Sequence, residues 1–480
     1  MKELNRTTIS DSSVRPVKIL QFGEGNFLRA FVDWMIDILN EKTSFNGSVQ
    51  IIQPIAQGMG DMINSQDGLY HVVLNGIKNG KESQNTRLIT CVKGAINPFT
   101  DHGAFLKTAE NPDLRFIVSN TTEAGINFDQ KDTDSKTLAQ TFPGKLTQLL
   151  FHRFQYYNGS PDKGLIIIPC ELIEKNGENL KIAIIQYVHH WNLSSDFKSW
   201  IEDHNIFCNT LVDRIVPGFP KDSIGEIQQS TGYKDQLVVM AEPFHLWVIE
   251  GDAIVQKALP MHEAELDVKF VKDLTPYRTR KVRILNGAHT TLVPVAYLKG
   301  LRTVRESIED PSTGNYLRKT IFEEIIPTLD LSQEELTQFS NDVIERFQNP
   351  FIRHELISIS LNSISKYKVR VLPSVLKYIE IRNQLPARLL FSLAALIRFY
   401  KGNWNGEEIP LNDTPEVLQF FKDAWQSGST DKIATLTLSN VSFWGQDLTQ
   451  IKGLLQIVVL YLNQIESEKS LPLEGLTGNR

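Results

Sequence analysis

The N-terminal part of the chain contains the stretch VKILQFGEGNFLRAFVDWMIDILN at residues 17–40. An apolar run ends at Gly23, and the apolar residues Phe27, Phe31 and Trp34 then recur at intervals of three and four, which is typical of a helix. A strand, a glycine turn and a helix in this order often begin a parallel sheet that is covered by helices. The stretch therefore predicts an α/β fold with a Rossmann-like N-terminal domain.

The rest of the chain falls into two parts. Apolar runs at 48–55, 87–96, 114–126 and 164–177 repeat the strand pattern and predict a mostly parallel sheet. From about residue 250 onward, helical periodicity dominates, for example in ARLLFSLAALIRFYKG at 387–402. We therefore expect a Rossmann-like NAD-binding domain at 1–250 and a mostly α-helical domain at 251–480 that binds substrate and carries the catalytic residues.

Composition narrows the class of protein. The net charge is −6 over 480 residues, which argues against a nucleic-acid binder. The three cysteines have no zinc or redox spacing, and so few cysteines in a long chain indicate a reducing compartment. No signal peptide and no apolar run long enough to span a membrane is visible. We expect a cytoplasmic protein whose partner is a small molecule, and its oligomeric state stays open.

The two glycines of FGEGNFLRA have the arrangement of a dinucleotide-binding turn. Gly23 permits a tight turn, and Gly25 lets backbone N–H groups approach a pyrophosphate at the start of the helix. The third glycine of that motif is replaced by Leu28, although Ala30 can supply the close helix–strand contact. Such turns also occur without a nucleotide, so the motif alone leaves both interpretations open. The predicted cofactor contacts are Phe22, Gly23, Gly25, Asn26 and Phe27.

Two further positions bear on the cofactor. The second strand should end in an acid that binds the ribose 2′-hydroxyl, but it ends in Gln53. Glutamine can bond a ribose hydroxyl, and no arginine follows to favour a 2′-phosphate, so the pattern favours NAD over NADP. The loop after the strand at 114–119 lies where cofactors bind in open α/β sheets, so Asn120 and Glu123 are expected near the nicotinamide ribose.

A polar cluster lies near the middle of the chain, in RKVRILNGAHTTL at 280–292. If 281–296 is an α-helix, Asn286 and His289 lie about 140° and about 80° around the axis from Lys281, on one side. A desolvated lysine can exchange a proton with an alcohol as hydride moves, and the other two side chains can donate hydrogen bonds to the oxygen. This chemistry needs no metal. The alternative is an amphipathic helix with an exposed lysine, a capping asparagine and a packed histidine.

Four segments stand in order along the chain: FGEGNFLRAF, NTLVDRIVP at 209–217, EPFHLWVIE at 242–250 and KVRILNGAHTTL. Together they resemble the mannitol dehydrogenase family, the polyol-specific long-chain dehydrogenases, and the similarity continues through 66–76 and 349–373. The resemblance implies a Rossmann-like domain, a helical C-terminal domain and metal-free NAD(P) chemistry. The family signature K-x4-N-x2-H falls on Lys281, Asn286 and His289, which implies a general acid/base, an oxyanion-stabilising group and a substrate contact.

The segment PCELIEKNG at 169–177 distinguishes branches of this family. Mannitol 2-dehydrogenases carry an asparagine after the acid, where this chain has Leu172. The segment looks more like the branch that reduces tagaturonate to altronate with NADH. Mannitol-1-phosphate 5-dehydrogenase, fructuronate reductase and free-polyol dehydrogenases of the same family remain alternatives. A protein of another class, a non-catalytic nucleotide-binding regulator, is a further alternative, against which the retained polar cluster argues.

The substrates of the tagaturonate-reducing branch and of mannitol-1-phosphate 5-dehydrogenase are both anions. SKYKVR supplies Lys366, Lys368 and Arg370, any of which can hold a carboxylate or phosphate, although a solvated helix face is the plain alternative. Lys366 lies where the resemblance implies the substrate lysine. Asp213 in VDRIVP is expected either to contact the ligand or to form an internal ion pair.

Overall fold

The computed structural model describes residues 1–480 apart from 11–12, 79, 123, 427, 469–470 and 477–480. The chain divides into two compact units. The N-terminal unit comprises Met1–Asn75 and Glu82–Leu274, and the helical unit comprises Gly76–Lys81 and Thr275–Arg480.

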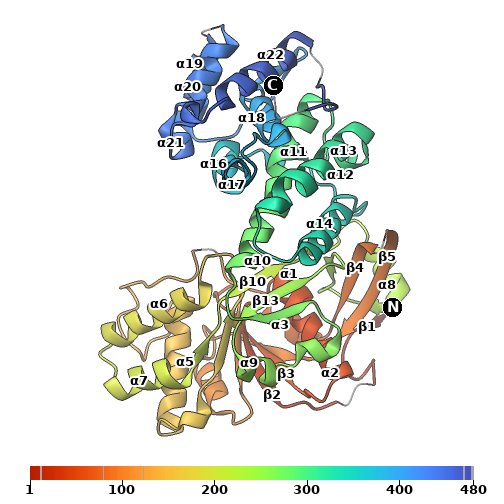
Figure 1. Ribbon diagram of the computed structural model, residues 1–480. Coiled ribbons are helices and arrows are strands. Elements are labelled where there is room, and N and C mark those ends of the chain that lie inside the picture. Colours follow the sequence, from red (N-terminus) through yellow and green to blue (C-terminus); the bar gives the residue numbers. More distant parts are fainter. Residues whose placement is uncertain (11–12, 79, 123, 427, 469–470, 477–480) are drawn as a thin grey trace. The chain divides into compact units, whose positions relative to one another are not determined.

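The main sheet of the N-terminal unit has six strands, and every neighbouring pair in it is parallel. In spatial order the strands are β6 (Val92–Ile96), β3 (Ser48–Ile52), β2 (Val17–Phe22), β7 (Phe116–Ser119), β8 (Ile166–Pro169) and β9 (Ile206–Phe207). Two of its strands, β2 and β3, are labelled in Figure 1. Numbered along the chain within this sheet, the order is 3-2-1-4-5-6, which is that of the Rossmann fold. The strand order reverses between β2 and β7, so the carboxyl ends of these two strands mark the expected cofactor edge.

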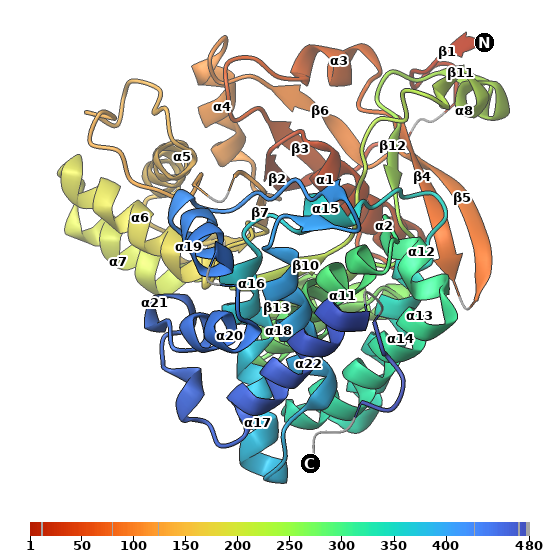
Figure 2. The same cartoon turned by 90° about the horizontal axis from the view of Figure 1, so that it is seen from above.

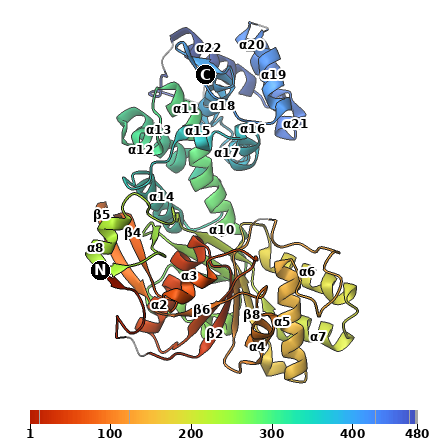
Figure 3. The same cartoon turned by 180° about the vertical axis from the view of Figure 1, so that it is seen from behind.

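Both faces of this sheet are buried, as expected for a parallel sheet between helices. In β2, Ile19 packs into the core on one face and Leu20 into the core on the other. Helices α5 (Phe142–Tyr156), α6 (Asn176–His190) and α7 (Ser195–His204) gather on the Leu20 face (Figure 3). The predicted alternation of apolar strands and covering helices is confirmed.

The chain leaves β2 through the glycine turn and enters a helical run that covers the Ile19 face. This run consists of α1 (Asn26–Leu28), a π-helical segment at Arg29–Asp33 and α2 (Trp34–Lys42). Its buried side, with Phe31 and Met35, packs into the same core as Ile19. The strand, turn and helix read from residues 17–40 therefore have the predicted order.

Smaller sheets complete the N-terminal unit. Strand β13 (Leu246–Glu250) pairs with β10 (Thr210–Asp213) on one side and with β14 (Val268–Val271) on the other. Because β14 lies beyond residue 250, the N-terminal unit continues to Leu274 and the boundary differs from the expected one. The stretch 87–96 is also divided: β5 (Lys81–Ile89) joins a sheet with β4 (Tyr70–Lys78) and β12 (Val239–Ala241), and only β6 joins the main sheet.

The second unit is mostly helical, as predicted. Its first helical run consists of α10 (Thr275–Arg280), a π-helical segment at Lys281–Asn286 and α11 (Gly287–Leu298). Helices α18 (Ala387–Phe399) and α22 (Leu454–Glu468) lie beside α11 in turn (Figure 2). The other main helices are α12 (Val304–Glu309), α13 (Pro311–Lys319), α14 (Gln333–Phe347), α16 (Ser363–Arg370), α17 (Leu372–Arg382), α19 (Pro415–Gln426), α20 (Thr430–Leu438) and α21 (Val441–Trp444). Within the described ranges no helix combines the length and apolarity needed to cross a membrane.

Candidate functional site

The glycine turn is tied to both neighbouring strands. The Gly23 N–H donates to the Ile52 carbonyl at 3.2 Å, and the Asn120 N–H donates to the Phe22 carbonyl at 3.3 Å. Gly23 has a φ of +127°, a region that favours glycine, as the turn motif predicts. A Cβ built on the exposed Gly25 would meet nothing within 4 Å, so open space lies before the helix that starts at Asn26. An anionic group can therefore approach this helix N-terminus, and the edge fits a dinucleotide pyrophosphate.

Arg29 fixes the shape of the turn from below. Its buried guanidinium donates to the Glu24 carbonyl at 3.0 Å, to the Leu237 carbonyl at 2.6 Å and to Asn26 Oδ1 at 2.7 Å. Burial lowers the pKa of Arg29. The Asn26 side chain, predicted as a cofactor contact, is thus positioned by Arg29 at the first residue of the helix.

The two aromatic residues predicted at the turn have different environments. The Phe22 ring is fully buried and packs on Phe142 with ring centroids 5.0 Å apart, so only its main chain reaches the sheet edge. The Phe27 ring is half-buried and stacks on Phe31 at 4.9 Å. Of the two side chains, only Phe27 lies where a ligand at the turn can contact it.

Gln53 follows β3 as predicted, but its amide is engaged inside its own loop. Nε2 donates to the carbonyls of Ile55 and Ala56 at 2.8 and 3.1 Å, and Oε1 accepts from the Gly60 N–H at 3.1 Å. The side chain is also buried. A contact between Gln53 and a ribose stays a prediction, and it would require the amide to give up these bonds.

The loops after β7 and β8 are joined by side chains. Asn120 Nδ2 donates to the Cys170 carbonyl at 2.7 Å, and the buried Glu171 carboxylate accepts from the Thr121 N–H at 2.9 Å and from Ser119 Oγ at 3.1 Å. Burial raises the pKa of Glu171. Asn120 therefore lies at the predicted sheet edge with its amide nitrogen engaged, whereas the predicted contact Glu123 lies outside the described residues.

Asp213 lies at the end of β10 and is buried. Its neighbour Arg214 donates to the carbonyls of Glu242 and Ala30 at 2.9 and 2.7 Å, and its guanidinium carbon lies 4.2 Å from the centre of the Trp34 ring. Burial lowers the pKa of Arg214 to about 9. Arg214 thus joins β10 to the helix that follows the glycine turn, which makes a structural role for this arginine the better supported one.

In the helical unit, the polar cluster is built on a π turn and not on the uniform α-helix expected for 281–296. The π segment runs from Lys281 to Asn286, and α11 begins at Gly287. Because a π-helix closes its hydrogen bonds between residues five apart, Lys281 and Asn286 lie about one turn from each other. The predicted angular separation is therefore wrong, whereas the prediction that both side chains share one side of the helix agrees with the π geometry.

His289 lies in the first turn of α11 within an aromatic environment. Its ring centroid is 4.2 Å from that of Phe347 and 5.1 Å from that of His354. Its Nε2 atom is buried and has no hydrogen-bond partner in the described part of the chain. Burial lowers the pKa of His289 well below its ordinary value, and the charge of His354 acts in the same direction. His289 is therefore neutral near pH 7 and retains a ring nitrogen for a ligand.

Three cations act on His289 electrostatically and lower its pKa further: Arg346, Lys366 and Arg370. Burial lowers the pKa values of Lys366 and Arg370, and Lys366 Nζ donates to the Ile359 carbonyl at 2.8 Å. Lys368 points elsewhere, since a Cβ on Gly445 after α21 would lie 3.7 Å from its Nζ. The structure thus brings Lys366 and Arg370 together with His289 and separates Lys368 from them.

The sequence predicted no role at the site for Arg346 or His354. His354 stands in the 349–373 segment that carries part of the family resemblance, so this segment was its available signal. Arg346 belongs to the amphipathic helix α14, where an arginine looks like an ordinary surface charge. Only the packing of α14 against the helical run of Lys281 reveals its proximity to His289.

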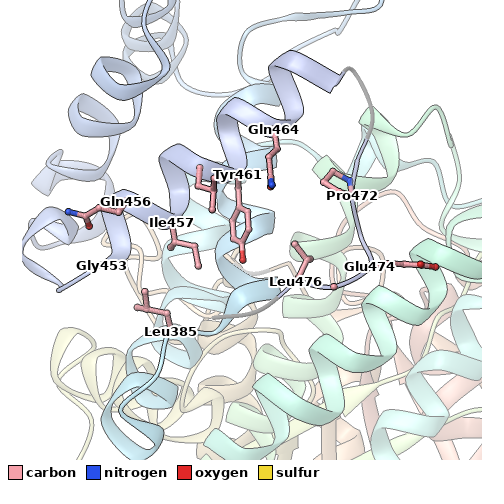
Figure 4. Close-up of a pocket in the computed structure, with 11 residues that line it drawn as sticks. Leu385, Gly453, Gln456, Ile457, Tyr461, Gln464, Pro472, Glu474 and Leu476 are labelled. Carbon is pink, nitrogen blue, oxygen red and sulfur yellow. The ribbon is translucent and has the colours of Figure 1, made fainter. Parts of the chain in front are cut away.

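A cavity of about 360 Å³ lies elsewhere in the helical unit, between α22 and the described part of the C-terminal segment (Figure 4). Its lining residues are Leu385, Gly453, Gln456, Ile457, Leu460, Tyr461, Gln464, Pro472, Glu474, Gly475 and Leu476. None of the candidate site residues lines it, so the cavity is separate from the polar cluster.

Comparison with known proteins agrees with these observations. Residues 17–263 match the mannitol dehydrogenase Rossmann domain, and residues 273–466 match the mannitol dehydrogenase C-terminal domain. An altronate oxidoreductase of Phocaeicola vulgatus is 49% identical over 473 residues, with 98% of each chain covered. An altronate oxidoreductase of Bacillus subtilis is 49% identical over 467 residues, which cover 97% of this chain and 96% of the relative.

Solved structures show the same fold at lower sequence similarity. D-sorbitol dehydrogenase in its substrate-free form has a TM-score of 0.80 at 22% identity, covering 97% of this chain and 99% of that one. The mannitol 2-dehydrogenase of Pseudomonas fluorescens, in a ternary complex with NAD and D-mannitol, has a TM-score of 0.66 at 20% identity, covering 97% of both chains. As the ordered motifs predicted, the chain belongs to the mannitol dehydrogenase family of oxidoreductases.

Proposed function

We propose that the chain is an NAD-dependent oxidoreductase that interconverts tagaturonate and altronate by reversible hydride transfer. The observation that carries this proposal is the positive charge around His289, from Lys366 and Arg370 of α16 and Arg346 of α14, in the same unit as Lys281 and Asn286. A sugar acid brings a carboxylate, for which guanidinium and ammonium groups are the strongest partners. The altronate oxidoreductases that resemble the chain over nearly its whole length support the same substrate class.

In the proposed reaction, Lys281 exchanges the proton. Its ammonium donates to the carbonyl oxygen of the ketone during reduction, and its amine takes the proton back from the alcohol during oxidation. Asn286, about one π turn away, donates an amide hydrogen bond to the same oxygen and stabilises the charge that develops there. NADH, when bound, supplies the hydride.

In the proposed reaction, His289 and the groups around it orient the substrate. The neutral imidazole can donate to or accept from a substrate hydroxyl through the unpartnered Nε2, while Phe347 holds the ring from one side. Lys366 and Arg370 lie one turn apart on α16 and can pair with the carboxylate. We assign Asp213 only as a candidate ligand contact in the N-terminal unit.

The cofactor would be held at the carboxyl edge of β2. The open space before Gly25, the helix that starts at Asn26 and the Rossmann strand order support a dinucleotide there. Asn120 follows β7, on the other side of the point where the strand order reverses, and is the candidate for the nicotinamide end. The absence of an arginine after Gln53 favours NAD.

The test is NADH oxidation with four substrates in parallel: tagaturonate, fructuronate, fructose 6-phosphate and fructose, each repeated with NADPH. We expect tagaturonate with NADH to give by far the highest kcat/KM. The Lys281→Ala variant tests the proton-transfer role of Lys281. It should lose most turnover and still bind NADH with the affinity of the unaltered protein. Preference for fructose 6-phosphate would overturn the substrate, and near-normal turnover of the variant would overturn the role of Lys281.

A further inference from the structure

An acidic side chain stands inside the glycine turn. Glu24 lies between Gly23 and Gly25, yet it is only 7% exposed. Its Oε1 accepts one long hydrogen bond, 3.4 Å from the Met59 N–H, and its Oε2 is buried with no hydrogen-bond partner among the described residues. Arg29 bonds the main-chain oxygen of Glu24 and not its carboxylate. Among the residues that the structure describes, one oxygen of this buried carboxylate is thus left without a hydrogen-bond donor.

The Glu24 side chain reaches the end of the neighbouring strand. Phe22 of β2 pairs with Ile52 of β3, so the turn after β2 and the loop after β3 lie at the same edge. A Cβ built on Gly58 would lie 2.1 Å from Glu24 Oε1 and 2.7 Å from Gln53 Cδ. The carboxylate and the Gln53 amide therefore lie next to each other beneath Gly58, at the position where the second strand of a Rossmann sheet ends.

A buried carboxylate oxygen without a donor is costly unless a ligand supplies one. In Rossmann folds this position binds the adenosine ribose through an acid at the end of the second strand. Here that place is held by Gln53, whose amide is engaged in its own loop. The covering residue Gly58 is exposed and has no side chain, and a single 3.4 Å bond joins its neighbour Met59 to the carboxylate.

We propose that Glu24 takes the place of the missing strand-end acid: its carboxylate accepts hydrogen bonds from the ribose hydroxyls of the adenosine half of the cofactor. The same negative charge repels a 2′-phosphate, so Glu24 is the residue that selects NAD against NADP. The ligand displaces Gly58 and Met59 from the carboxylate as it binds. This inference rests on the proposed use of a nicotinamide dinucleotide and adds the residue that discriminates between the two forms.

The experiment measures dissociation constants of NADH and NADPH by fluorescence titration, without substrate, for the unaltered protein and for Glu24→Gln. We expect the unaltered protein to bind NADH more tightly than NADPH. In Glu24→Gln, NADH binding should weaken about tenfold, as for one charge-assisted hydrogen bond, and NADPH binding should tighten. Glu24→Asp keeps the charge but moves it away from the ribose by one methylene group, so it should lose NADH affinity and still reject NADPH.

Controls separate this inference from the proposed function. Glu226→Gln, an exposed position of the same unit, should leave both constants unchanged. Glu24→Gln is isosteric and removes a desolvated charge, so its unfolding temperature should not fall. If the unaltered protein binds both dinucleotides and the ratio of constants is the same in Glu24→Gln, the assignment of Glu24 is overturned and the proposed function stands. If the unaltered protein binds neither dinucleotide, both are overturned.

Discussion

Two lysines on one turn of α16 differ in their surroundings, and this difference leads to a prediction about the substrate. Lys366 acts electrostatically on His289, whereas Lys368 points toward Gly445. Lys366→Ala should raise KM for tagaturonate about 10- to 100-fold, the loss of one charge-assisted hydrogen bond. Lys368→Ala, the matched control, should change KM by less than about twofold. Steady-state kinetics with each variant checks this.

Two outcomes would contradict this assignment of the carboxylate. One is an equal rise in KM for the Lys366 and Lys368 variants, which would indicate a general effect of positive charge. The other is a loss of NADH affinity in Lys366→Ala, which would indicate a disturbed fold. A partial recovery in Lys366→Arg would support a direct contact, because an arginine can still pair with a carboxylate.

At the residue scale, the sequence predicted which residues stand at the turn better than it predicted which groups their side chains contact. The role of Gly23 follows from a turn that needs a positive φ, and the structure has that φ. Whether Gln53 is free to bind a ribose depends on how the loop 55–60 folds back on it, which no local pattern contains. The unsatisfied oxygen of Glu24 has the same origin, since only tertiary packing buries a glutamate between two glycines.

At the element scale, the helical run of the polar cluster shows a limit of periodicity. Apolar spacing of three and four residues predicts a helix over 281–296, and a helix is present. A π segment changes the register of only one turn, so the surrounding pattern still looks α-helical. For that reason the sequence could predict that Lys281 and Asn286 share one side of the helix, but not the angle between them around the helix axis.

The helix α18 beside α11 depends on a buried acid for its first turn. Glu324 accepts from the N–H groups of Arg388 and Leu389 at 3.0 and 2.9 Å, and it is only 3% exposed. Glu324→Ala would leave these buried donors unsatisfied and remove bonds to a charged group. We expect it to lower the free energy of unfolding by about 3 kcal/mol, measured by equilibrium urea unfolding.

The adjacent Glu323 provides the matched control for Glu324. Both acids pair with the Arg388 guanidinium: Nη1 lies 3.2 Å from Glu324 Oε1 and 2.9 Å from Glu323 Oε2. The Glu323 side chain, however, is 53% exposed. Solvent screens such a pair, so Glu323→Ala should cost about 0–1 kcal/mol. Equal losses for the two variants would show that the arginine, and not the capped helix turn, is what matters.

At the scale of the whole molecule, the two-part organisation could be predicted and the assignment of single strands could not. The apolar runs of β2, β3, β7 and β8 each predicted a strand of the parallel sheet, because a strand buried on both faces is apolar throughout. Residues 87–96 look like one strand, yet β5 and β6 join different sheets. The choice of sheet is set by partners far away in the chain, such as β3 for β6 and β4 for β5.

Stability against pH is a property of the whole molecule to which one buried acid of the N-terminal unit contributes. Asp33 is fully buried beneath the glycine turn and accepts from Tyr70 Oη at 2.8 Å and from Gln21 Nε2 at 3.3 Å, and burial raises its pKa to about 7. The folded protein therefore holds a proton on Asp33 that the unfolded chain releases above pH ~4, so this group's stabilising contribution falls as pH rises from about 4 to about 7 and is lost above that. The slope from one such group is at most about 1.4 kcal/mol per pH unit.

Asp33→Asn should lack this contribution. Its free energy of unfolding should therefore rise relative to that of the unaltered protein between about pH 4 and about pH 7, and the two should run parallel above that. Urea unfolding from pH 4 to pH 8.5 measures the difference in the free energy of unfolding between Asp33→Asn and the unaltered protein. The exposed Asp113→Asn is the matched control. A difference that does not change with pH would show that Asp33 stays ionised in the folded protein.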